Sequence, residues 1–147
     1  MDRKSTDNFI GAWQLLSFEI RQEGGAVIQP FGPDPKGSII YTDTGRVSAQ
    51  VMRSDRPEFA NEDQMKGTPG EMEASFRGCI SYFGAYHVNR EAGFVTHRIE
   101  SSLFPNWEGD EQQRFFEFSG HRLTLSTPPL QWGGERMIAV LVWDRVQ

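Results

Sequence analysis

The stretch that decides the fold is FVTHRIESSLFPNW, which runs from Phe94 to Trp107. In a β-strand successive side chains point to opposite faces, so alternate residues share a face. One face of this stretch is apolar apart from a single imidazole, and it collects Val95, His97, Ile99, Ser101 and Leu103. The other face collects Thr96, Arg98 and Glu100, which suit solvent. We therefore expect a half-buried strand that carries His97 on its inner face.

Strand patterns recur along the chain with short connections between them. They cover residues 11–20, 38–42, 46–52, 80–89, 94–107, 112–118, 121–127 and 135–146. Both faces of 11–20 are apolar, so periodicity leaves its inner face open. About eight strands without alternating helices predict an all-β antiparallel meander. Closure into an eight-stranded up-and-down barrel would hide the sheet edges, and an open two-sheet sandwich is the alternative.

One short helix is predicted between the third and fourth strands. The sequence TPGE at 68–71 has the capping-box pattern, with proline at the first helical position. Met72 and Phe76 lie four residues apart on one face of this helix, and we expect them to pack against the core. Gly78 is expected to end the helix. The polar segment 53–66 before it predicts a long loop, a candidate lid.

The composition limits the class of protein. A chain of 147 residues suits one domain, here residues 9–147 behind a loose segment, 1–8. A net charge of −5 without a basic run argues against nucleic acid as a partner. No apolar run approaches the roughly 20 residues of a membrane span, and the start shows no signal peptide. A cytoplasmic location is the default expectation. One cysteine excludes an internal disulfide. A homodimer is possible.

Several phrases resemble the lipocalin-like domain family of small bacterial and fungal proteins. They are GAW at 11–13, PFGPDPKGSIIYT at 30–42, MRSDRPEFA at 52–60, YFGAYHV at 82–88, VTHRIESSLFPNW at 95–107 and RLTLSTPP at 122–129. The resemblance implies a barrel around a ligand-sized cavity. It also implies that Trp13 closes the barrel floor beneath an arginine of the last strand, for which Arg145 is the candidate. No single reaction follows from it.

Three residues are candidates for catalysis. His97 could move a proton near neutral pH, or it could be a hydrogen-bonded core residue. Tyr82 could orient a ligand carbonyl, or it could belong to an aromatic core. Arg114 shares a face with two phenylalanines, so it is either inside and paired with Glu19 or a ligand anion, or exposed to solvent. No metal or cofactor is expected, because no nucleotide or metal motif occurs.

Further residues are candidates for ligand binding. Tyr86 shares the face of Tyr82, and Ser48 and Gln50 could add polar contacts from the third strand. Five aromatic residues lie in predicted loops, where they could grip an apolar ligand at the barrel mouth or pack on its rim. They are Phe31, Phe59, Phe104, Trp107 and Trp132.

Three functions fit these residues. The first is an enzyme of small-molecule biosynthesis that binds a small, largely apolar metabolite and catalyses a cofactor-free acid–base rearrangement, an isomerisation or a cyclisation. In this reaction His97 moves a proton while Tyr82, Tyr86 or Arg114 stabilises an oxyanion. The second is a non-catalytic carrier or sequestering protein for such a ligand. The third is a structural or regulatory domain whose interior is filled with side chains.

Overall fold

The computed structural model describes residues 8–147, so most of the expected loose segment 1–8 lies outside the described residues. The strands are β1 (Gly11–Gln22), β2 (Val27–Ile28), β3 (Lys36–Tyr41), β4 (Arg46–Met52), β5 (Cys79–Asn89), β6 (Phe94–Ser102), β7 (Glu111–Ser119), β8 (Arg122–Ser126), β9 (Leu130–Trp132) and β10 (Glu135–Arg145). The helices are α2 (Pro69–Arg77) and the 3-10 turns η1 (Gln64–Lys66) and η2 (Pro105–Trp107).

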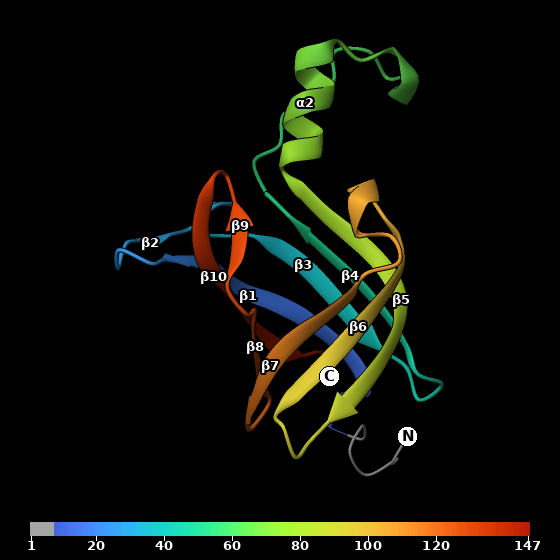
Figure 1. The fold of residues 1–147 in the computed structure, drawn as a ribbon. Helices are drawn as coiled ribbons and strands as arrows, with labels where there is room; N and C mark the ends of the chain where they lie inside the picture. The colour runs from blue at the N-terminus through green and yellow to red at the C-terminus, as the bar shows by residue number, and fades with distance from the viewer. Residues whose placement is uncertain (1–7) are drawn as a thin grey trace.

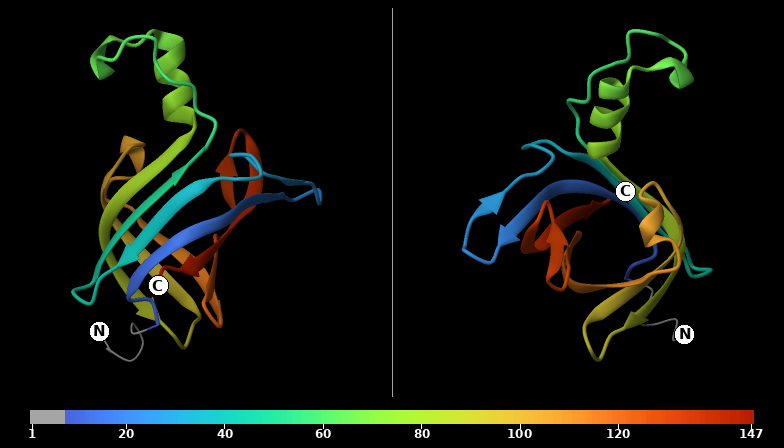
Figure 2. Two further views of the ribbon diagram at one scale, coloured as in Figure 1. Left: turned by 180° about the vertical axis from the view of Figure 1, so that it is seen from behind. Right: turned by 45° about the horizontal axis from the view of Figure 1, so that its top comes forward.

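The strands form one closed antiparallel sheet. Their order is β2-β1-β3-β4-β5-β6-β7-β8-β10-β9, and β1 also pairs with β10, so that eight long strands close a barrel (Figures 1 and 2). The two-residue β2 and the three-residue β9 add to it at β1 and β10. The predicted eight-stranded up-and-down barrel is thus confirmed. No helix of the described residues is long and apolar enough to cross a membrane.

A bulge explains why both faces of β1 looked apolar in the sequence. The pairing of β1 with β10 shifts register between Leu15 and Ser17. Trp13 and Leu15 are buried before this bulge, and Phe18 and Ile20 are buried after it. An extra residue in one strand reverses the alternation of faces. Each half of β1 therefore turns a different sequence face to the barrel interior.

The helix α2 lies between β4 and β5, the third and fourth strands of the barrel, as predicted. Its capping box is complete, with the Thr68 side chain accepting from the Glu71 N–H and the Glu71 side chain accepting from the Thr68 N–H. Gly78 ends it. The expected core packing is wrong, because Met72 and Phe76 are 43% and 47% exposed. Figure 1 shows why: α2 extends away from the barrel rim instead of lying on it.

The floor of the barrel has the arrangement that the family resemblance implies. The Trp13 side chain is fully buried and its indole N–H donates to the Phe9 carbonyl at 2.9 Å. The Arg145 guanidinium lies 4.2 Å from the centre of the Trp13 ring and donates to the carbonyls of Ile10 and Asn8. Gly11 has a positive φ of 132°, and a Cβ there would meet the Arg145 guanidinium.

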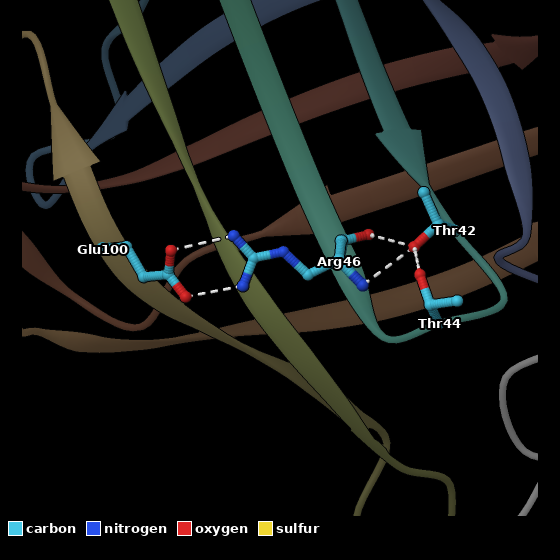
Figure 3. Close-up of polar contacts among 4 residues, drawn as sticks. All are labelled: Thr42, Thr44, Arg46 and Glu100. Carbon is cyan, nitrogen blue, oxygen red and sulfur yellow. Dashed lines mark hydrogen bonds and ion pairs between the residues drawn. The ribbon is translucent and has the colours of Figure 1, made fainter.

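A second bulge bends the sheet between β5 and β6. Gly84 pairs with Ile99, whereas Phe83 pairs with Ser101, so Glu100 is the extra residue. A Cβ on Gly84 would collide with the Arg98 carbonyl oxygen, so the close approach of the two strands requires glycine. On the outer face Arg46 reaches across β5 and binds both carboxylate oxygens of Glu100, at 2.5 and 2.8 Å (Figure 3). This ion pair joins β4 to the bulged residue of β6.

The hairpin that precedes Arg46 is fixed by its own side chains. Figure 3 shows the hydroxyl groups of Thr42 and Thr44 together, 2.9 Å apart. The Thr42 hydroxyl also accepts from the Arg46 N–H at 3.0 Å, and Gly45 takes the positive φ that the turn needs. The predicted turn at 43–45 is confirmed, and it sets the register of β3 against β4.

Candidate functional site

The barrel interior contains a cavity of about 480 Å³. This volume lies within the roughly 300–1,000 Å³ of small-molecule sites. Its walls are mainly inward-facing apolar residues of the strands: Phe18, Ile39, Ala49, Val51, Ile80, Leu125, Met137, Ala139, Leu141 and Trp143. Its polar lining includes Tyr82, His97, Gln112, Arg114 and Thr127. The interior is therefore not filled entirely by side chains, contrary to the premise of the third function considered above.

His97 lies at the centre of a buried chain of three side chains. The imidazole is 1% exposed. Its Nε2 lies 2.7 Å from the Tyr41 hydroxyl and its Nδ1 lies 2.8 Å from the Tyr82 hydroxyl. Burial, reinforced by the positive charge of Arg114, lowers the pKa of His97 to about 3. The imidazole is therefore neutral at physiological pH.

The neutral state of His97 fixes how the three groups share their hydrogens. A neutral imidazole has one N–H donor and one acceptor nitrogen, so one tyrosine donates to it and the other accepts from it. Tyr41 is 1% exposed and, among residues 8–147, its hydroxyl has only His97 as a partner. If the Tyr41 hydroxyl accepted a hydrogen bond from His97, its own hydrogen would be buried without an acceptor. Tyr41 therefore donates to Nε2, and Nδ1–H donates to Tyr82.

This arrangement leaves one hydrogen for a ligand. Tyr82 lines the cavity, and its oxygen accepts from His97, so its own O–H is free to donate into the interior. Burial raises the pKa of Tyr82 above its ordinary value, although the Arg114 charge opposes this. Burial also raises the pKa of Tyr41. Both phenols stay protonated at neutral pH, and Tyr82 can present a hydrogen-bond donor to a ligand oxygen.

Arg114 faces the interior, one of the two alternatives that the sequence left open. It stands opposite the buried Val95 in the β6–β7 pairing and lines the cavity. The expected partner Glu19 is on the outer face, beside Arg21. Within residues 8–147 no carboxylate is within ion-pair distance of Arg114, whose guanidinium donates to Gln112 Oε1 at 2.6 Å and to the Gln113 carbonyl. The cavity wall thus carries a cation without a counter-ion.

Three residues expected in the interior do not line the cavity. Ser48 and Gln50 lie on the outer face of β4, where the Gln50 amide donates to the Ser48 hydroxyl at 3.1 Å. The alternation of buried Val47, Ala49 and Val51 in the same strand is the sequence signal for this orientation. Tyr86 is buried on the inner face, but its hydroxyl donates to the Thr42 carbonyl below the cavity lining.

Three of the five loop aromatics line the cavity. Trp107 in η2 and Trp132 in β9 are half-buried, and Phe104 is 41% exposed. Trp107 stands edge-on to Tyr82, with 6.2 Å between ring centres. The same three residues also border a second hollow between α2 and the barrel rim. They lie at the end of the interior that opens toward α2.

The other two loop aromatics have structural positions. Phe31 is buried against Phe18, with 5.2 Å between ring centres, and it borders the outer hollow only. Phe59 packs on Gly67 within the segment before α2. No residue of 53–66 lines the cavity, but Arg53, Asp55, Arg56 and Pro57 border the outer hollow, so a lid over its entrance stays a prediction. Leu103, expected inside, is 41% exposed because the Glu100 bulge reverses the alternation of β6.

The remaining titratable residues do not form a second site. His87 and His121 are exposed, as predicted. Within residues 8–147 no three His, Cys, Asp or Glu side chains lie close enough together to hold a metal ion. The free thiol of Cys79 is half-buried, and burial raises its pKa, which disfavours the nucleophilic thiolate.

The closed barrel, the Trp13–Arg145 floor and the ligand-sized interior define the lipocalin type of protein. A family model described as a lipocalin-like domain matches residues 10–146, and the chain belongs to this family. The chain is also 33% identical over 107 residues to the 4'-hydroxy-3'-methoxypropiophenone carrier protein ppsC of Aspergillus oryzae. That alignment covers 68% of this chain and 96% of the fungal protein.

Proposed function

We propose that this protein binds and carries a small, largely apolar aromatic ketone or phenol inside its barrel. The observation that carries the proposal is the cavity of about 480 Å³, whose walls are mainly apolar and whose polar groups include Tyr82, His97 and Arg114. Transfer of an apolar ring system from water to a cavity with apolar walls is favourable, because it removes apolar surface from water. Tyr82 and Arg114 supply hydrogen-bond donors for one carbonyl or phenolate oxygen of the ligand. These hydrogen bonds fix the orientation of the ligand.

The electrostatics of the site favour carriage over catalysis. A general base must accept a proton, but a charged His97 would be an imidazolium buried beside the Arg114 cation. A general acid must give up a proton, but burial also opposes a tyrosinate at Tyr41 or Tyr82. The three groups therefore suit neutral hydrogen bonding.

The fungal relative supports the ligand class. Its name describes a carrier of an aryl ketone that also bears a hydroxyl and a methoxy group. Such a molecule combines a flat apolar ring with oxygen acceptors, which suits the mainly apolar walls and the donors of Tyr82 and Arg114 in this cavity. Phe104, Trp107 and Trp132 offer aromatic contacts where the ligand enters.

Isothermal titration with 4'-hydroxy-3'-methoxypropiophenone tests the proposal, and we expect one ligand per chain. Ala49 and Ser48 are neighbours on opposite faces of β4, and only Ala49 lines the cavity. Ala49→Leu should reduce affinity by at least tenfold, whereas Ser48→Leu should leave it unchanged. Equal effects of the two variants, or the absence of binding to the wild type, would refute an interior site for this class. Native mass spectrometry of freshly purified protein would detect a retained ligand.

A cofactor-free isomerisation or cyclisation of such a ligand is the second candidate. The observation that favours it is the Tyr41–His97–Tyr82 chain, which reaches the cavity at Tyr82. Proton movement along such a chain could protonate a substrate oxygen. Mass and NMR spectra of the ligand after incubation distinguish the two candidates. Turnover that His97→Gln abolishes with little change in affinity would establish the enzyme, and an unchanged ligand with weaker binding would support the carrier.

Two further predictions accompany this function. From the sequence alone, a cytoplasmic location is the default expectation and the choice between a monomer and a homodimer is open. Light scattering behind size-exclusion chromatography measures the mass in solution and so distinguishes a single chain of 16.7 kDa from a homodimer.

A further inference from the structure

Arg114 brings to the cavity wall a positive charge that no carboxylate of residues 8–147 balances. On β7 it shares the inner face with Phe116 and Phe118, which pack against the core. Arg114 is half-buried rather than fully buried, so a ligand can reach its side chain. Its acceptors are the uncharged Gln112 side chain and Gln113 carbonyl. A guanidinium carries more N–H donors than these two acceptors use, so further donors remain for a ligand.

The Arg114 charge acts on the polar groups of the interior. Burial is the main influence on the pKa values of Tyr41, Tyr82 and His97, and the Arg114 charge lowers the pKa at all three. A side-chain hydrogen bond from Arg114 also lowers the pKa of Tyr82, so the guanidinium and this hydroxyl are neighbours. The imidazole and both phenols are neutral at physiological pH. They therefore leave the charge of Arg114 unbalanced.

Glu111 is the one carboxylate among the described residues that border the cavity. It is exposed, and the alternation of β7 places it on the opposite face of the strand from Arg114. Its partner in the sheet is Arg98, which is also exposed. Glu111 therefore does not serve as the counter-ion of Arg114. A cation in mainly apolar surroundings is costly without a partner, and a bound anion would supply that partner.

We propose that the cavity binds an acyl phenol as its phenolate anion, with Arg114 as the counter-ion and the Tyr82 O–H as a second donor to the phenolate oxygen. This inference rests on the proposed function and specifies the charge of the ligand. The phenol proton is released to water. Two donors that converge on an anionic oxygen form charge-assisted hydrogen bonds, which are stronger than neutral ones.

The chemistry of an acyl phenol suits such a site. A phenolate para to a carbonyl group shares its charge with the carbonyl oxygen, so it loses less hydration than a carboxylate when it enters an apolar cavity. For the same reason the parent phenol is more acidic than a tyrosine side chain. Burial also raises the pKa of Tyr82, so the ligand gives up its proton before Tyr82 does.

The absorption spectrum of bound para-hydroxypropiophenone tests the inference. The phenolate of this ketone absorbs at longer wavelength than the phenol, so a pH titration of the complex gives the pKa of the bound ligand. We expect this pKa to lie about one pH unit below that of the free ligand, because the phenolate should bind about tenfold more tightly than the phenol. At a pH between the two values, addition of protein should therefore produce the phenolate band.

A matched pair of variants locates the charge that is responsible. Arg114→Gln should return the pKa of the bound ligand to the free value or above it, because apolar walls alone favour the neutral phenol. Arg98→Gln removes the same charge from the outer face of β6 and should preserve the wild-type pKa. Equal effects of the two variants would show a general effect of protein charge and would overturn the inference.

A second measurement uses the wild type alone. In para-methylpropiophenone a methyl group of similar size replaces the hydroxyl, so this ketone has no acidic proton. Isothermal titration between pH 6 and pH 9 should show the affinity for the hydroxy ketone increasing about tenfold with pH and then levelling off above the pKa of the free ligand. The affinity for the methyl ketone should stay constant.

The outcomes separate the inference from the function on which it rests. If the hydroxy ketone binds with its pKa unchanged or raised, or if its affinity decreases as the pH increases, the inference is wrong and the carrier function stands. If neither ketone binds, the aryl-ketone function fails, and the inference fails with it.

Discussion

The hydroxyl of Tyr41 lies 2.7 Å from Nε2 of His97, although 56 residues separate the two in the sequence. This contact joins β3 to β6 across the interior of the barrel. It lies beneath the cavity, because Tyr41 does not line it whereas His97 does. Tyr41 therefore acts on the ligand only through His97, by holding the imidazole with Nδ1–H directed toward Tyr82.

Tyr41→Phe should lower the free energy of unfolding by about 1–3 kcal/mol, because Nε2 is left as a buried acceptor without a donor. Urea denaturation measures the loss. Tyr82→Phe is the matched control and should cost less, since water in the cavity can reach Nδ1 in place of the lost hydroxyl. Equal losses in the two variants would contradict the expected access of cavity water to Nδ1.

The buried His97 should make stability depend on pH. The folded pKa is about 3 and the unfolded pKa is about 6.5, so between these values the unfolded chain binds a proton that the folded protein does not. The contribution of His97 to the free energy of unfolding is therefore fully present above about pH 6.5, and it is lost as the pH decreases toward 3. The slope approaches 1.4 kcal/mol per pH unit.

His97→Gln should remove this contribution, because glutamine does not titrate. Urea denaturation of the variant and the wild type between pH 7 and pH 4.5 measures the difference in slope. His121→Gln, at an exposed position, should retain the wild-type slope. If the free energies of unfolding of the wild type and His97→Gln differed by the same amount at every pH, the prediction would be wrong.

Gly84→Ala should destabilise the barrel by roughly 2–4 kcal/mol, because the new Cβ collides with the Arg98 carbonyl in the neighbouring strand. The expected result is a lower midpoint of thermal unfolding. Gly70→Ala has open space around its Cβ and lies in the first turn of α2, so it should be neutral or slightly stabilising. Tolerance of alanine at position 84 would show that β5 and β6 can separate at the bulge.

Arg145→Met should cost about 2 kcal/mol, since it removes the guanidinium above Trp13 and two hydrogen bonds to backbone carbonyls. Chemical denaturation measures this value. Arg122→Met is the control, because among residues 8–147 the Arg122 guanidinium makes only an exposed pair with Asp144. A similar loss in the two variants would mean that the floor does not depend on Arg145.

Much of the fold could be predicted from local patterns. The capping box at 68–71, the turn at 43–45 and the inward face of Val95 and His97 each depend on a few neighbouring residues. For Arg114, alternation gave a shared face with two phenylalanines but left open whether that face lies inside. Local sequence suffices where the chain alternates regularly.

The rest depends on contacts between distant segments. The bulge at Glu100 reversed the alternation and turned Leu103 outward, and its cause is the approach of Gly84 on another strand. Met72 and Phe76 have the spacing of a packed helix face, yet α2 has no barrel wall beneath it. The role of Tyr41 was not predicted, because its hydroxyl meets His97 only in the folded barrel. A buried imidazole needs partners, but the sequence does not name them.

The pairing of β1 with β10 has a consequence for protein synthesis. These strands are the first and the last of the barrel, and they pair from Trp13 and Arg145 to Gln22 and Met137. Until β10 leaves the ribosome, β1 keeps an open edge there, and the apolar interior has no wall on that side. Before β10 pairs with β1, the interior lacks one wall and cannot enclose a ligand. A nascent chain that stalls before β10 therefore exposes an aggregation-prone strand edge. The last strand both closes the barrel interior and covers this edge.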